Sequence, residues 1–177
     1  MSTEHIEGAV EAITSRFGEA IETDETTRSG LRQLVVKPDA LLDILRLIRD
    51  EHNFRQLYDL TAADYLEQEP YIHIIYHVNC LHPPAKLLVK ARVDRNGGTV
   101  PSATGLWSMA NWYEREVYDL FGVVFDGHPD LKRILMPDDW MGHPLRRDYP
   151  LTEEPIQFAN YTSDMLPSEV IPKQYED

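Results

Sequence analysis

Proline is concentrated at one end of this 177-residue chain, and this divides the sequence into two parts. Seven of the twelve prolines fall in residues 129–177, where the apolar residues keep neither a helical nor a strand period. The same region holds large apolar side chains such as Trp140, Leu145 and Tyr149. A proline-stiffened chain cannot bury that much apolar surface against itself, so we expect it to lie on another surface. The sequence therefore predicts a compact domain over residues 1–128 and an extended segment after it that wraps a partner protein.

The first part carries clear secondary-structure patterns. Apolar residues spaced three and four apart, together with helix-start signals, predict helices over residues 5–17, from Pro38 onward, and over 111–121. Alternating or β-branched runs predict strands over residues 31–36, 54–65, 71–78 and 86–93. In the last helix, Asn111 and Glu114 have the spacing of a capping box, and Gly122 stands where a terminating glycine belongs. This order predicts an α+β fold, a two-layer sandwich of helices on a mainly antiparallel sheet.

Charge and cysteine content exclude several classes of function. The chain has 17 basic and 30 acidic residues, a net charge of −13, which disfavours nucleic-acid binding because phosphate backbones would be repelled. Cys80 is the only cysteine, so a disulfide within the chain is impossible and a reducing compartment is expected. Iron–sulfur clusters usually need four cysteines. We therefore expect no iron–sulfur cluster on this chain's own residues, and structural zinc sites, which usually take several Cys and His, are disfavoured as well.

The sequence also predicts no direct membrane insertion. The N-terminus lacks the basic and apolar regions of a signal peptide. The apolar run Leu41–Ile48 is interrupted by Asp43 and Arg46, and no stretch approaches the roughly 20 apolar residues that span a bilayer. We expect a chain that is soluble by itself and attaches to membranes only through partners.

A dense charged motif lies in the last predicted helix. Glu114, Arg115, Glu116 and Asp119 lie beside bulky apolar residues. One interpretation is a solvated helix face with an Arg115–Asp119 pair contributing a few tenths of a kcal/mol. The other is an interface, where arginine and carboxylates fix the register against a partner.

The residues that follow carry a family resemblance. The motif continues through Leu120, Phe121, His128 and Lys132 or Arg133 to Ile134, and a second block runs from Gly142 to Pro150 as Gly-His-Pro-Leu-Arg-Arg-Asp-Tyr-Pro. Together these roughly 40 residues resemble the 30 kDa subunit family of respiratory complex I, the NADH:quinone oxidoreductase. The strands over 71–78 and 86–93 fit the family more loosely.

The resemblance implies a structural, docking role in the peripheral arm of a proton-pumping quinone oxidoreductase. It implies packing on the 49 kDa subunit that forms the quinone site, beside cluster-bearing subunits, peripheral on the cytoplasmic face of the membrane. Iron–sulfur clusters, flavin and quinone would belong to the partner subunits, and no catalytic, cofactor-binding or metal-binding residue is expected here. Arginine and aromatic residues tend to dominate interface energetics. The residues expected at the partner interface are Glu114, Arg115, Glu116, Asp119, His128, Arg133, Trp140, His143, Leu145, Arg146, Arg147 and Tyr149.

Other interpretations stay open at this point. The chain could be the equivalent subunit of a membrane-bound hydrogenase or a ferredoxin-fed oxidoreductase, because these machines share the module. A free-standing metal-dependent hydrolase would use His128 and His143 with nearby aspartates. His73 and His77 share one strand face but lie roughly 13 Å apart by strand rise, too far for one ion. Cys80 is expected to be a buried, inert thiol.

Overall fold

The computed structural model describes residues 2–66 and 68–150. Its main sheet has five strands in the order β1-β2-β5-β4-β3. The strands are β1 (Ile21–Thr26), β2 (Arg32–Val36), β3 (Gln56–Asp64), β4 (Tyr71–Cys80) and β5 (Ala85–Asp94). All neighbours pair antiparallel except β2 and β5, which are parallel. The expected mainly antiparallel α+β sandwich is confirmed.

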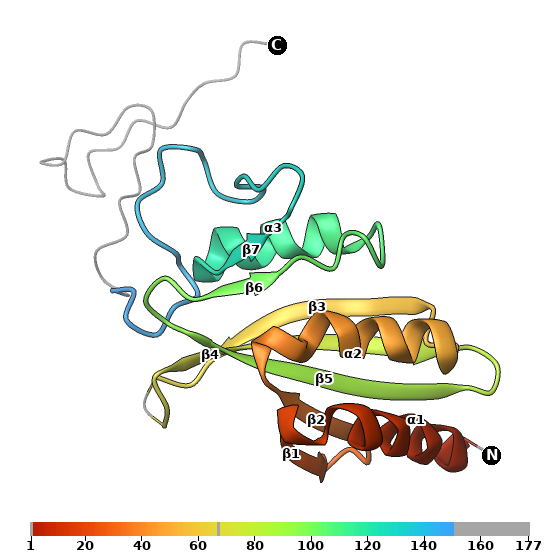
Figure 1. The fold of residues 1–177 in the computed structure, drawn as a ribbon. Coiled ribbons are helices and arrows are strands. Elements are labelled where there is room, and N and C mark those ends of the chain that lie inside the picture. The colour runs from red at the N-terminus through yellow and green to blue at the C-terminus, as the bar shows by residue number, and fades with distance from the viewer. Residues whose placement is uncertain (1, 67, 151–177) are drawn as a thin grey trace, which may run out of the picture.

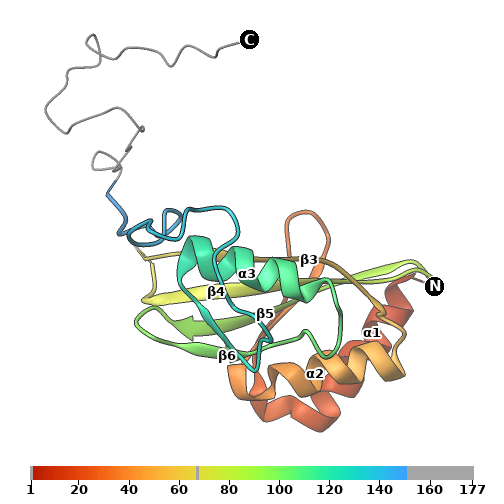
Figure 2. The same cartoon turned by 90° about the horizontal axis from the view of Figure 1, so that it is seen from above.

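Three helices accompany the sheet (Figure 1): α1 (Ser2–Phe17), α2 (Pro38–Glu51) and α3 (Ala110–Phe121). A short 3-10 turn, η1 (Gly18–Ala20), follows α1. Helices α1 and α2 contact β5, and α3 contacts β3. In Figure 1 α2 lies in front of the sheet and runs roughly along β3 and β5, whereas α3 runs beside β3. The two ends of the described chain lie at opposite ends of the domain, as Figures 1 and 2 both show.

The core lies between the helices and one face of the sheet. Alternate residues of the central strands are buried there, because side chains of a strand point to opposite faces in turn. Helix α2 contributes an apolar stripe that is buried on the same core. The residues with the largest fully buried side chains include Ile13, Leu34, Leu41, Leu45, Phe54, Leu60, Ile74, Tyr76 and Leu87.

A second, two-stranded sheet flanks α3. Strands β6 (Thr99–Pro101) and β7 (Val124–Asp126) pair in parallel before and after the helix. Gly122 ends α3 in the left-handed conformation with φ 77°, as expected from its position. The expected capping box is wrong: Met109, not Asn111, is the N-cap and its side chain makes no capping hydrogen bond, while Glu114 turns inward to the loop after β6.

Candidate docking surface

Residues 131–150, called here the pinned segment, form no helix or strand but are fastened to the domain. Their backbone groups bond to the end of α3, and further contacts reach the end of the main sheet. In Figures 1 and 2 this part of the chain follows α3 and then descends toward the β3 and β5 ends. An irregular segment keeps one shape only when its backbone groups have fixed partners.

Asp119 is the principal anchor of the pinned segment. Its fully buried side chain accepts hydrogen bonds at Oδ2 from the backbone amides of Ile134, Leu135 and Met136, at 3.0, 2.7 and 2.8 Å. Its Oδ1 accepts from Arg133 Nη1 at 2.7 Å. Burial by itself would raise the pKa of Asp119, but these hydrogen bonds outweigh burial and hold the pKa below its usual value. The carboxylate is therefore ionised, and it fixes three successive amides.

Two arginines extend this network through backbone carbonyls. Arg133 Nη2 donates to the carbonyls of Trp140 and Gly142, both at 3.0 Å. Arg115, one turn before Asp119 on α3, donates to the carbonyls of Lys132 and Arg133 at 3.1 and 3.0 Å. A guanidinium offers several donors in a fixed plane, which suits it to gather carbonyls from an irregular loop.

His143 fastens the next turn against the C-terminal end of α3. Its Nδ1 donates to the carbonyl of Asp119 at 2.8 Å, and the amide of Leu145 donates to the carbonyl of Leu120 at 3.0 Å. The imidazole lies so close to Gly122 that a Cβ there would sit 2.5 Å from its Cδ2 atom. Gly122 is thus required twice, for its positive φ and for the approach of the histidine.

His128 performs a similar task at the other end of α3. Its Nε2 donates to the carbonyl of Asn111 at 3.2 Å, while its Nδ1 accepts from the amide of Asp130 at 3.1 Å. A carbonyl only accepts and an amide only donates, so the ring is the neutral Nε2–H tautomer. Both histidines considered for a metal site therefore bond to the backbone of α3.

A buried ion pair holds the end of the pinned segment to the sheet. Asp64, the last residue of β3, pairs with Arg95 just after β5, and both side chains are almost fully buried. Arg95 also pairs with Asp148 at 2.8 Å, and Asp64 Oδ2 accepts from the backbone amide of Arg147 at 2.7 Å. Arg146 contacts Asp148 in turn. This cluster, called here the sheet clasp, joins residues 83 apart in sequence.

Glu114 is a buried carboxylate that has no basic partner among the described residues. Oε2 accepts from the hydroxyl of Ser102 and Oε1 from the amide of Ala103, both at 2.7 Å. Its side chain is fully buried, and it faces Tyr76 of β4 closely enough to raise the pKa of that phenol further. Burial raises the pKa of Glu114 to about 7, in spite of both hydrogen bonds.

We expect Glu114→Gln to remove a pH dependence of stability. The pKa is raised in the folded chain, so the group stabilises below its ordinary 4.5, and this contribution is lost as the pH rises through about 7. The ionised form above pH 7 costs about 3 kcal/mol, whereas glutamine mimics the neutral acid. Urea unfolding at pH 5.5 and 8 should show that the free energy of unfolding of the variant, relative to that of the parent, is higher at pH 8 than at pH 5.5. Glu116→Gln, at an exposed position of the same helix, is the control. The prediction would be contradicted if the free energy of unfolding changed equally between pH 5.5 and pH 8 in all three proteins.

The outer side of the pinned segment carries exposed apolar side chains. Leu135 is 61% exposed, Met141 79% and Leu145 53%. Single exposed apolar residues are common, but here three occur within eleven residues, and the backbone of this stretch is fixed by hydrogen bonds to α3 and within the segment. The segment therefore presents apolar groups on a shape that is already fixed.

The comparisons with known proteins agree on one family. The model of the "Respiratory-chain NADH dehydrogenase, 30 Kd subunit" family matches residues 34–155. The chain belongs to this family. The C subunit of the NADH-quinone oxidoreductase of Citrifermentans bemidjiense is 43% identical over 143 residues, covering 81% of this chain and 88% of its own. The same subunit of Moorella thermoacetica is 50% identical over 121 residues, covering 68% and 81%.

Solved structures of the family's fold match as well. A trypsin-resistant fragment of Nqo5, residues 1–134, superposes with a TM-score of 0.64 at 28% identity, covering 72% of this chain and 99% of that one. A chain of an archaeal respiratory membrane complex, the membrane-bound sulfane sulfur reductase, reaches a TM-score of 0.70 at 28% identity, covering 82% and 86%. The resemblance seen in the sequence is thus confirmed at the level of the family.

The structure separates the twelve residues expected at an interface into two groups. Those whose polar groups are engaged within the chain are Glu114, Arg115, Asp119, His128, Arg133, His143 and Arg146. Glu116, Leu145 and Arg147 have exposed side chains, and Trp140 and Tyr149 are half-buried. Contact of any of them with a partner stays a prediction. From the sequence, we did not predict that Asp64, Arg95 and Gly122 hold the segment. For Asp64 one signal was available, because the alternation of β3 places this residue on the buried face.

No metal-binding or membrane-spanning feature is found in the described ranges. Over residues 2–66 and 68–150, no three His, Cys, Asp or Glu side chains gather closely enough to hold an ion. Nor is any helix in those ranges both long and apolar enough to cross a bilayer. His73 and His77 lie on β4, as expected for a strand, where His73 faces Glu69 at 2.7 Å and His77 lies against Tyr58.

Proposed function

We propose that this chain is a non-catalytic structural subunit of the peripheral arm of an NADH- or other donor-driven quinone oxidoreductase. It docks on the 49 kDa subunit that forms the quinone site, and its neighbours carry the iron–sulfur clusters, the flavin and the quinone. The complex lies on the cytoplasmic face of the membrane, to which this chain attaches through its partners. Membership of the 30 kDa family and the names of its relatives support this assignment.

The observation that carries the docking role is the pinned segment. Its inward polar groups already form hydrogen bonds with α3, with the sheet clasp or within the segment, so few of them are free to bind a ligand or a substrate. Its outward side offers Leu135, Met141 and Leu145 to solvent. A surface that is ordered before binding loses little conformational entropy on binding, which favours stable assembly. The role of this segment is to present apolar anchors to the 49 kDa subunit.

A related membrane complex is the second candidate. The archaeal sulfane sulfur reductase chain matches with a higher TM-score than the Nqo5 fragment, so the fold serves in more than one kind of respiratory complex. The purified assembly separates the two candidates: reduction of a quinone by NADH favours the first, and a different donor or acceptor favours the second.

The pair of substitutions Met141→Ser and Leu145→Ser tests the docking role. We expect the N-terminally tagged variant to retrieve at least tenfold less of the cluster-bearing subunits, because buried apolar anchors contribute most of an interface's binding energy. Both side chains are exposed, so the melting temperature of the isolated chain should change little. Leu66→Ser, an exposed leucine beyond β3, is the matched control. Normal recovery of the partners by the variant would contradict the proposal.

A further inference from the structure

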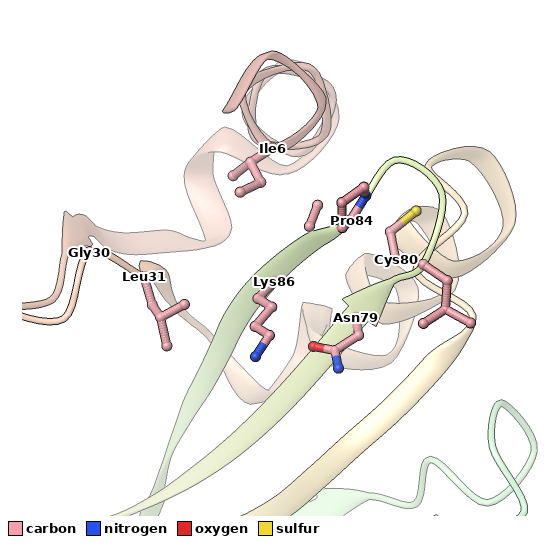
Figure 3. A pocket seen from close by; sticks show the side chains of 9 residues that line it. Ile6, Gly30, Leu31, Asn79, Cys80, Pro84 and Lys86 are labelled. Carbon is pink, nitrogen blue, oxygen red and sulfur yellow. The ribbon is translucent and has the colours of Figure 1, made fainter. Parts of the chain in front are cut away.

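A second surface lies at the opposite end of the domain from the pinned segment. Two adjoining cavities of about 410 and 570 Å³ share Ile6 and Gly30 as lining residues. They lie between α1, the β1–β2 turn and the β4–β5 hairpin. Figure 3 shows the first, with Ile6 on α1, Leu31 beyond the turn, and Cys80 and Pro84 on the hairpin. Both volumes fall in the range of binding pockets.

The groove formed by these two cavities has an apolar floor. Ile6 and Val10 line it from α1, and Leu31 lines it from the end of the β1–β2 turn. Leu81, at the tip of the hairpin, is 64% exposed at its edge. The groove thus leaves apolar side chains accessible alongside α1.

The charge on the groove is one-sided. Glu7 and Glu11, one turn apart on α1, line the larger cavity, are exposed, and make no hydrogen bond or ion pair within the described chain. The two lining cations are engaged elsewhere: Arg32 pairs with Asp24 at 2.5 Å, and Lys86 lies over the ring of Tyr58. In Figure 3 the amine of Lys86 points away from Ile6. The uncompensated charge along the groove is therefore negative.

We propose that this groove binds a basic amphipathic segment of another subunit of the same complex. Apolar side chains of that segment fill the floor, and its Lys or Arg side chains pair with Glu7 and Glu11. This rests on the proposed function, since it assumes an assembly. A second copy of the chain is a poor occupant, because its net charge of −13 would be repelled by Glu7 and Glu11. The segment 151–177 of the chain itself is a poor occupant for the same reason, since it holds six acidic residues and one basic residue. An anionic lipid surface would be repelled in the same way.

A photo-cross-linker at Thr3 tests the groove in the intact complex. Thr3 lines the larger cavity and is exposed, so benzoylphenylalanine fits there without entering the core. After irradiation, mass spectrometry should identify an adduct with a peptide of another subunit that combines Lys or Arg with apolar residues. Adding Glu11→Lys should lower the adduct yield at least fivefold. Glu19→Lys, an equal charge change on the exposed turn after α1, should leave the yield unchanged.

The outcomes separate the groove from the docking role. If the complex forms but no adduct appears, the groove proposal is wrong and the role of the pinned segment still stands. An adduct with an acidic peptide, with this chain itself or with lipid also overturns it, as does a yield that Glu11→Lys leaves unchanged. If the tagged chain retrieves no other subunit at all, the proposed function fails, and the groove proposal fails with it.

Discussion

Asp119→Ala should release the pinned segment and destabilise the chain by about 3 kcal/mol or more. The substitution leaves three backbone amides without their acceptor and removes the buried carboxylate that pairs with Arg133. Breaking a buried ion pair from one side typically costs about 3–5 kcal/mol. Urea unfolding measures the loss, and hydrogen exchange should show rapid exchange at Ile134, Leu135 and Met136.

Asp130→Ala is the matched control for this effect. Asp130 pairs with Lys132 at 2.7 Å, but both side chains are more than half exposed, so the free energy of unfolding should change little. The account of Asp119 would be contradicted if Asp119→Ala lost less than about 1 kcal/mol while the amides of residues 134–136 stayed protected. Because the variant changes no exposed side chain of the segment, weaker assembly would show that its shape matters.

Arg95→Met should open the sheet clasp, with an expected loss of about 3 kcal/mol. Methionine fills similar space but leaves Asp64 ionised and almost fully buried, with only backbone amides as donors. Asp148 loses its contact with the sheet as well and keeps only Arg146 of the pinned segment itself, so the end of the pinned segment should detach. Limited trypsin digestion should then cleave after Arg146 or Arg147 several times faster than in the parent.

A second variant distinguishes the ion pair from a general packing defect. Adding Asp64→Asn to Arg95→Met removes the unpaired charge, so the double variant should recover part of the lost stability. Arg16→Met is the control, because Arg16 bonds Glu51 through both oxygens but both side chains are about half exposed. A loss in Arg95→Met no larger than in Arg16→Met, with unchanged cleavage, would refute the clasp.

The fold could be predicted from the sequence wherever burial imposes a period. The alternation of β4 and β5 and the apolar stripe of α2 show which face is buried, and these elements agree with expectation within a few residues. Strand β1 was missed because its residues are acidic and exposed, so no alternation marks it. The short pair β6 and β7 and the parallel pairing of β2 with β5 depend on long-range contacts that no local pattern reveals.

The charged motif of α3 was harder to interpret. Glu114 is one turn from Ala110 and Val117, on the buried stripe, so helix geometry alone places it inward. Asp119 lies off this stripe and is buried because the pinned segment covers it, which local sequence cannot show. The interpretation as a solvated face does not describe these two carboxylates, which are buried and bonded within the chain, whereas contact with a partner stays a prediction. Both carboxylates bind the chain's own backbone.

Hydroxyl-radical footprinting of the isolated chain and of the purified complex tests the central claim most directly. Met141 is 79% exposed and Leu145 is 53% exposed, so both should oxidise readily in the isolated chain. If the pinned segment docks on a partner, their oxidation rates should fall at least fivefold in the complex. Tyr71, 39% exposed at the start of β4, serves as the internal reference. Rates for Met141 and Leu145 that are the same in both samples, relative to Tyr71, would contradict the docking role of this segment.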